Sequence, residues 1–254
     1  MRPRVLLFLM ALLYGPHVHA QLSLRNDTVA LPFIQVHYLY QQPEADMGNR
    51  FDANSAIGGG VYYKNRYNWS YGLTASFLFG GSVREENLFG SIATHDGRLV
   101  TSGGRLTTVE TDMRGLRVMG SLGKIFPWIG PNPNSGVSLQ LGAGLLQHRI
   151  NFANNQSDVP QIQGDYQKGY DRLTNGFALV PQLTYLRFDN ENFINVRAGL
   201  DLTLAWTQSR RDWNYAENRA IDEARFDVLI GFKGAWVFPI FDKQSRVQRK
   251  KSPF

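Results

Sequence analysis

The segment from residue 67 to residue 80 alternates large apolar side chains with small or polar ones. From Trp69 to Phe79 the odd positions carry aromatic, leucine or alanine side chains, while the even positions up to Ser76 carry serine, glycine or threonine. A period of two places these sets on opposite faces of a β-strand. A strand that separates lipid from a crowded polar lumen requires such faces, so the segment predicts a strand of a transmembrane β-barrel.

Seven further segments repeat this alternation. They lie at residues 33–41, 55–64, 114–126, 136–150, 176–188, 194–206 and 225–238. Together the eight segments predict an all-β fold, an eight-stranded antiparallel up-and-down transmembrane β-barrel. A soluble barrel or sandwich would present its polar face to water. Here that face would be rich in glycine, which disfavours the soluble alternative.

The links between the segments alternate in length. Long links fall at residues 42–54, 81–113, 151–175 and 207–224, and short ones at residues 65–66, 127–135 and 189–192. Membrane barrels place tight turns on the periplasmic side and long loops outside the cell. We therefore expect both termini in the periplasm.

The N-terminus has the pattern of a cleavable signal peptide. Arg2 and Arg4 precede an apolar run, and Val18 and Ala20 stand at the positions before the expected cut. The apolar run is shorter than the roughly 20 residues of a spanning helix. We expect a signal peptide at 1–20, a periplasmic segment at 21–31, an outer-membrane barrel at 32–241 and a basic periplasmic tail at 242–254.

Composition adds three constraints. The chain has 254 residues, a formal net charge of +6 and no cysteine, so neither a disulfide nor a cysteine-linked lipid anchor is available. Export separates the chain from nucleic acid, which we do not expect as a partner. The basic tail is expected to be solvated, with contact to anionic lipid or an envelope polymer as the alternative.

Charges on the outward faces are expected at two positions, Lys124 and Arg187. Both lie near the predicted periplasmic end of a strand, where a long side chain reaches water. Aromatic residues cluster at the ends of the segments, which predicts girdles at both membrane interfaces.

The inward faces predict a filled lumen, because eight strands enclose an interior that side chains just fill. A buried charge needs a partner. We expect Asp201 to pair with Arg197, Lys233 or Arg117 as structural bracing, with a proton or ion relay as the alternative. The candidate luminal charge network comprises Arg117, Arg197, Asp201, Arg225, Asp227, Lys233 and His37.

An enzymatic barrel would need catalytic groups at its rim. His148 and Asp227 are expected near the outer ends of their strands, and His95 in the longest loop, but no serine has a Gly-x-Ser-x-Gly setting. The histidines are too scattered for a metal site. We expect no enzymatic activity, no catalytic residues, no metal and no cofactor.

Two long loops carry further signals. Residues 81–113 predict a small hairpin with Gly103 and Gly104 at its turn. The loop at 151–175 mixes aromatic residues with both charge signs, a composition typical of contact with protein or glycan, with a solvated lid as the alternative. The candidate binding residues are Tyr166, Lys168, Tyr170, Asp171 and Arg172.

The signal peptide, alternating segments, long loops and lack of cysteine together resemble small outer-membrane barrels of the OmpA-transmembrane and OmpX type. Three motifs are similar to outer-membrane β-barrels common in Bacteroidota, a set that includes PorT-like secretion-associated barrels. The motifs are Ser55-Ala-Ile-Gly-Gly-Gly-Val-Tyr-Tyr-Lys64, Asn132-Pro-Asn-Ser-Gly136 and Lys168-Gly-Tyr-Asp-Arg-Leu173. The resemblance implies a multi-pass protein among outer-membrane lipid and lipopolysaccharide, with an envelope protein as a partner.

These observations predict a monomeric outer-membrane barrel with a plugged lumen. Its expected role is structural, or binding through the extracellular loops, or accessory to an envelope or secretion complex. The first alternative is a narrow channel for small solutes, and the second is a lipid-modifying enzyme.

Overall fold

A computed structural model describes residues 27–85, 87–153, 159–189, 194–221 and 223–240. The expected signal peptide at 1–20 and basic tail at 242–254 lie outside the described residues. Residues Leu24–Ile240 form one compact unit. Within the described part of the chain, no helix has the length and apolar character needed to cross a membrane.

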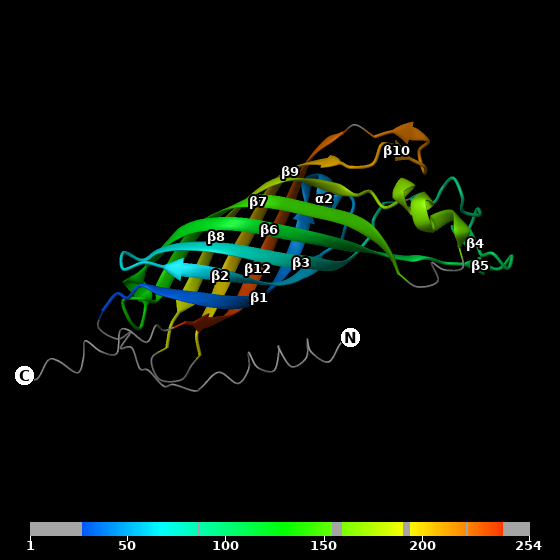
Figure 1. The fold of residues 1–254 in the computed structure, drawn as a ribbon. Helices are drawn as coiled ribbons and strands as arrows, with labels where there is room; N and C mark the ends of the chain where they lie inside the picture. The colour runs from blue at the N-terminus through cyan, green and yellow to red at the C-terminus, as the bar shows by residue number, and fades with distance from the viewer. Residues whose placement is uncertain (1–26, 86, 154–158, 190–193, 222, 241–254) are drawn as a thin grey trace, which may run out of the picture. The chain divides into compact units, whose positions relative to one another are not determined.

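Eight long strands close into a barrel in which every neighbouring pair is antiparallel (Figure 1). Neighbours in the barrel are also neighbours along the chain, and the first strand pairs with the last. The predicted eight-stranded up-and-down antiparallel barrel is therefore confirmed. The strands are β1 (Leu31–Glu44), β2 (Asn54–Lys64), β3 (Trp69–Ser82), β6 (Glu110–Phe126), β7 (Gly136–Ala153), β8 (Thr174–Arg187), β9 (Val196–Ser209) and β12 (Ala224–Pro239).

The strands extend further into the long loops than the sequence predicts. In β1 the alternation of buried and exposed residues continues without interruption to Glu44. The strands β6 and β7 likewise run on to pair Glu110 with Ala153. At the opposite end β3 begins at Trp69 rather than at residue 67, because residues 65–68 form the turn.

The outward face of the barrel is apolar on all eight strands. Its large side chains are exposed by about half, which is the exposure of a face with nothing packed on it. Examples from each strand in barrel order are Tyr38, Phe232, Leu200, Leu183, Leu141, Leu122, Leu73 and Val61.

The expectation of only two outward charges is wrong. Arg114 and Arg149 also face outward, directly opposite each other on β6 and β7. Arg114 forms an ion pair with Asp112 at 2.8 Å. Both arginines lie at the loop ends of their strands, where the chain leaves the apolar band and a guanidinium can reach water.

The inward face is only partly polar. Apolar side chains fill the lumen near the loop end, among them Leu39, Leu78, Leu146 and Leu229, all with no exposed surface. Near the end with short turns, Phe33 stacks on Tyr62 with ring centroids 5.0 Å apart and meets Phe188 edge to face. Arg117, Asp201 and Lys233 lie between these two apolar groups, whereas His148 and Asp227 lie beyond the leucines, toward the loop end.

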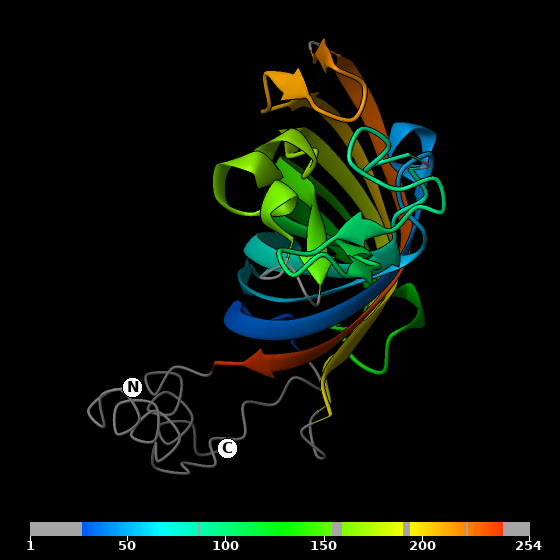
Figure 2. The ribbon, with the colours of Figure 1, turned by 90° about the vertical axis from the view of Figure 1, so that its right-hand side faces the viewer.

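Short elements decorate the connections, and those of the long loops gather over one end of the barrel, which Figure 2 views end-on. The predicted hairpin is confirmed: β4 pairs with β5, and Gly104 has a positive φ of 74° in the turn between them. A second two-stranded sheet, β10 with β11, was not predicted. The short elements are α2 (Ala45–Gly48), β4 (Leu99–Val100), β5 (Leu106–Thr107), β10 (Trp213–Asn214), β11 (Arg219–Ala220) and the 3-10 turns η1 (Pro127–Ile129), η3 (Pro160–Ile162) and η4 (Gly164–Gly169).

Candidate functional site

The loop between β1 and β2 folds into the mouth of the barrel. Its helix α2 packs against β12, and Met47 and Phe51 have no exposed surface. Both side chains join the apolar cluster that includes Leu39 and Leu78 on the inward face. This loop, residues 45–53, therefore forms a plug that fills the mouth with apolar side chains.

Ion pairs hold the other long loops together above this plug. The guanidinium of Arg172 donates two hydrogen bonds to Glu85 Oε1, at 2.6 and 2.8 Å, and one to Asn214 Oδ1 at 2.7 Å. Arg211 donates to both oxygens of Asp171, at 2.5 and 2.8 Å. These contacts connect the loop between β3 and β6, the loop between β7 and β8, and the loop between β9 and β12. Together the three loops form an ordered cap.

Aromatic rings reinforce the cap. Tyr170 lies 5.8 Å from Phe89 and 5.6 Å from Tyr215, measured between ring centroids. Phe89 also meets Phe152 at 5.6 Å. The four rings come from three loops and the end of β7, and their contacts bury surface that isolated loops would expose.

Of the five predicted binding residues, three are buried within the cap and two are exposed. Tyr170, Asp171 and Arg172 are only 3%, 2% and 5% exposed, because they hold the loops to one another. Their side chains therefore make their contacts within the cap. Tyr166 is 65% exposed, and Lys168 is exposed and paired with Asp165 at 2.6 Å.

Arg50 connects the cap to the plug. Its Nε lies 3.4 Å from Glu85 Oε2, and its backbone oxygen accepts a hydrogen bond from Arg84 N. Burial lowers the pKa of Arg50 to about 10, and the nearby Arg225 acts in the same direction. The guanidinium remains charged at neutral pH, so its pair with Glu85 persists.

The predicted luminal network divides into two groups. In the middle of the lumen, Asp201 pairs with Arg117 at 2.8 Å and accepts a hydrogen bond from Gln182 at 2.7 Å. Of the three cations expected as partners for Asp201, Arg117 makes the ion pair. His37 lies in the same group and bonds Ser76 at 2.8 Å.

The second group lies closer to the loop end. His148 Nε2 is 2.9 Å from Asp227 Oδ2, which also accepts a hydrogen bond from Thr207 at 2.5 Å. Arg225 lies 3.7 Å from Asp227 Oδ1 and donates to the backbone oxygen of Asp46 at 2.6 Å. His148, Asp227 and Thr207 are all buried beneath the plug.

The segment that leads into β1, from Asp27 onward, forms a strap across the other end of the lumen. Asn134 bonds the N-terminal segment twice, through Val29 N and Asp27 O, both at 2.9 Å. It also accepts from the fully buried Lys64 Nζ at 2.8 Å, and Lys64 donates to Val29 O at 2.9 Å. The Asn-Pro-Asn-Ser motif therefore pins the entering chain across the barrel end.

Neither a scan against protein-family models nor a search of curated proteins finds a match. Solved structures of outer-membrane barrels do match. Ail of Yersinia pestis, in complex with the heparin analogue sucrose octasulfate, has a TM-score of 0.39 at 11% identity over 83% of this chain and 99% of Ail.

Two barrels of Pseudomonas aeruginosa give similar values. The outer membrane protein OprG has a TM-score of 0.40 at 11% identity, covering 85% of this chain and 98% of OprG. The N-terminal β-barrel domain of OprF has a TM-score of 0.34 at 12% identity, covering 82% of this chain and 99% of that domain. At these values the likeness concerns architecture, and we take no function from it.

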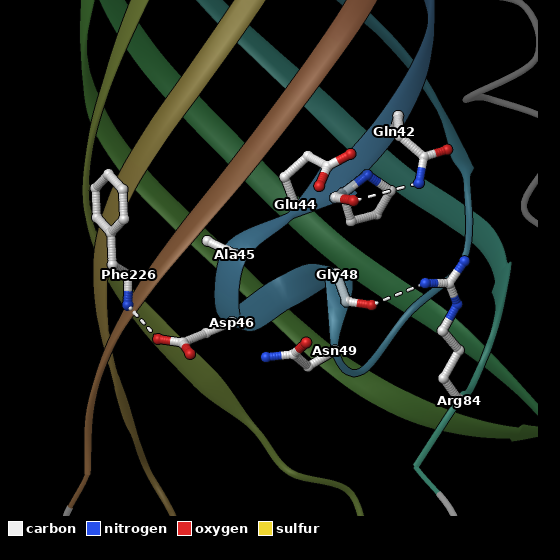
Figure 3. Close-up of a pocket in the computed structure, with 9 residues that line it drawn as sticks. Gln42, Glu44, Ala45, Asp46, Gly48, Asn49, Arg84 and Phe226 are labelled. Atoms are coloured by element: carbon white, nitrogen blue, oxygen red, sulfur yellow. Dashed lines mark hydrogen bonds between the residues drawn. The ribbon is translucent and has the colours of Figure 1, made fainter.

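An open polar pocket of about 540 Å³ lies at the loop-end rim, beside α2 (Figure 3). Asp46 accepts a hydrogen bond from Phe226 N at 2.8 Å, and Arg84 donates to Gly48 O at 3.2 Å. Glu44 and Gln42 line the same pocket from the end of β1. Its hydrogen bonds hold the plug loop to its neighbours, so the pocket is built from the contacts that fix the plug.

No metal centre is visible in the part of the chain that the structure describes. Among those residues, no three histidine, cysteine or acidic side chains come together as metal ligands. The sequence reasoning missed Lys64, Asn134, Arg50 and Glu85, which close the two ends. The signals available were the inward parity of Lys64 and the Asn-Pro-Asn-Ser motif.

Proposed function

We propose that the protein is an integral outer-membrane β-barrel with a plugged lumen and a binding role at its loop cap. The observation that supports membrane insertion is the outward face, which is apolar on all eight strands of a closed barrel. In water this face would be a very large apolar surface. In a bilayer it meets hydrocarbon, while closure satisfies every strand edge.

The plugged lumen supports a role other than transport. The strap at one end, the paired charges in the middle and the apolar plug at the other end leave buried side chains along the whole interior. A narrow solute channel is the first alternative. Steady openings of the purified full chain in planar bilayers would support that channel, and their absence over a range of voltages would support the plug.

The cap supports binding because it presents aromatic and charged side chains on an ordered base. Tyr166, Trp213 and Tyr215 are 65%, 44% and 39% exposed. Rigid aromatic side chains bind at a low entropic cost and are enriched in interaction hot spots. We propose that these side chains contact a partner protein in the cell envelope, in an accessory role to an envelope or secretion complex.

The experiment is affinity purification of the tagged full chain from native outer membranes. We expect an envelope protein to copurify with the wild type and to be lost from a Tyr166→Ala, Trp213→Ala variant. A matched control is Leu106→Ala, which lies in the separate β4–β5 hairpin. If the wild type, the double variant and the control all recover the same amount of the envelope protein, the aromatic side chains do not bind it. If the wild type is found in the soluble periplasm, it does not insert into the membrane.

The protein is proposed to be a monomer surrounded by outer-membrane lipid and lipopolysaccharide, without enzymatic activity. The lipid-modifying alternative predicts altered lipid A in a deletion strain. An unchanged lipid A mass spectrum in that strain supports the proposal, and a loss of one acyl or headgroup species contradicts it.

A further inference from the structure

The middle of the lumen carries more positive than negative charge. Arg117, Arg197 and Lys233 are at most 3% exposed, and Lys233 is within electrostatic reach of both arginines and of Asp201. Asp201 is the single carboxylate among the described residues of this group, and it is committed to Arg117. Among the described residues, Arg197 and Lys233 have no carboxylate within ion-pair distance, because the one nearby carboxylate pairs with Arg117.

Arg197 also has unused hydrogen-bond donors. Its Nη1 donates to the neutral amide oxygens of Gln35 and Gln140, at 3.1 and 3.2 Å. Its Nε and Nη2 are buried and find no acceptor among the described residues. The rings of Tyr62 and Phe33 lie 4.9 and 5.6 Å from the guanidinium carbon, so both make cation–π contacts with it.

Two hydroxyl groups on the inward faces of β7 and β8 are likewise unused. Ser138 and Thr184 are buried, and neither Oγ atom has a hydrogen-bond partner in the described part of the chain. The two residues face each other in register on β7 and β8. Ser138 is two residues from Gln140, so it lies on the same inward face as the amide that holds Arg197.

The strand register aligns these donors. Thr184 pairs with Gly199, and Gly199 pairs with Lys233, so one row crosses four strands from Ser138 to Lys233. Gly199 contributes no side chain between Thr184 and Lys233. Arg197 lies two residues from Gly199 on the same inward face of β9. The register therefore places two unused hydroxyl groups and the side chain of Lys233 at one level of the lumen, with Arg197 two residues away.

We propose that this row binds an anion of halide size, held by Arg197, Lys233 and the hydroxyl groups of Ser138 and Thr184. Water could satisfy the hydroxyl groups but would leave the buried guanidinium of Arg197 uncompensated, and an uncompensated buried charge is far costlier than an unmade hydrogen bond. An anion accepts from all of these donors and removes the charge imbalance. The site is independent of the proposed binding role of the cap.

Thermal unfolding of the full chain in a zwitterionic detergent tests the site. Bromide and chloride are compared with gluconate, which is too large for the row, at equal ionic strength. Specific binding raises the melting temperature by about 5 to 10 °C at a hundredfold excess of halide over its dissociation constant. The same melting temperature in all three salts would overturn the proposal.

A double variant separates binding from a general salt effect. Ser138→Ala with Thr184→Val removes two unused donors at nearly constant shape, so the fold is retained and the halide-dependent increment is reduced severalfold. The matched control is Ser121→Ala, whose hydroxyl donates to Gly72 O at 3.4 Å elsewhere in the lumen. If halide raises the melting temperature of the double variant, the control and the wild type by the same amount, Ser138 and Thr184 do not bind the anion.

Crystals grown in bromide supply a direct readout. An anomalous scattering peak within hydrogen-bond reach of Arg197 Nη2 supports the proposal, and a peak that disappears in the double variant ties it to the hydroxyl groups. A lumen without such a peak, at data quality sufficient to locate the methionine sulfurs, overturns it.

Discussion

Asp201 on β9 and Arg117 on β6 form an ion pair across the lumen, 2.8 Å apart, between strands separated by β7 and β8. Both side chains are at most 3% exposed. Arg117 also donates to Thr203 at 2.5 Å, so the guanidinium is fixed by more than one acceptor on β9. This contact braces opposite walls of the barrel.

The first prediction removes that brace. Asp201→Ala leaves Arg117 charged and buried without its carboxylate, which we expect to cost about 3 to 5 kcal/mol of the free energy of unfolding. Urea unfolding of the detergent-solubilised protein measures the change. The matched control is Asp165→Ala, whose ion pair with Lys168 is solvent-exposed and should have little effect. An equal response of the two variants would contradict the bracing role.

The second prediction tests the outward face at two depths. Leu202 lies near the middle of β9 on the outward face, whereas Gln147 faces outward near the loop end of β7. In a bilayer, Leu202→Arg should cost about 2 to 4 kcal/mol, and Gln147→Arg about 0 to 1 kcal/mol. Folding into lipid vesicles, followed by urea unfolding, gives both values.

The depth dependence is the informative result of that experiment. If the two arginine variants were equally stable in vesicles, no apolar band would surround the barrel. A parallel measurement in detergent-free buffer should yield aggregates for every variant, because the large apolar outward side chains remain exposed there.

The third prediction concerns the strap. Asn134→Ala removes the acceptor of Val29 N and one acceptor of the buried Lys64 Nζ. We expect faster amide exchange at Val29 and its neighbours, and a loss of about 1 to 3 kcal/mol of stability for the unsatisfied ammonium group. Hydrogen exchange with mass spectrometry reads the strap directly. Asn151→Ala, at the opposite end of the barrel, should leave exchange in the strap unchanged.

The barrel could be predicted from the sequence because strand alternation is a local property. Whether Leu73 or Thr74 faces outward depends on parity alone, and a one-residue error would reverse every side chain of the strand. The eight strands and the direction of their faces follow from this pattern. The hairpin of residues 99–107 was predictable for the same reason, since its turn is marked by adjacent glycines.

The ends of the lumen could not be predicted in this way. Glu85 and Arg172 are 87 residues apart in the chain, and nothing local to either shows that the loops meet. The same applies to Lys64 and Asn134, which are 70 residues apart. The burial of Tyr170 and Asp171 depends on these long-range contacts, so composition alone could not show that the two side chains lie inside the cap.

The fourth prediction loosens the loop cap. Arg172→Ala breaks two hydrogen bonds to Glu85 and one to Asn214, and it leaves the half-buried Glu85 with only the longer contact to Arg50. Charged hydrogen bonds of this kind contribute about 1.5 to 3 kcal/mol each, so local opening becomes at least about tenfold more frequent. Cleavage of the loops by a nonspecific protease should accelerate by the same factor, because it tracks the open population.

Arg219→Ala is the matched control for the cap. Arg219 also pairs with two carboxylates, those of Glu217 and Glu223, but all three side chains are about half exposed, so water replaces the lost contacts. We expect loop cleavage in this variant at the wild-type rate, with the barrel strands protected in both variants. Rapid cleavage of wild type, Arg172→Ala and Arg219→Ala alike would show that the loops are not held by Arg172. The surface formed by Tyr166 and Trp213 would then lack the ordered base on which the proposed binding role depends.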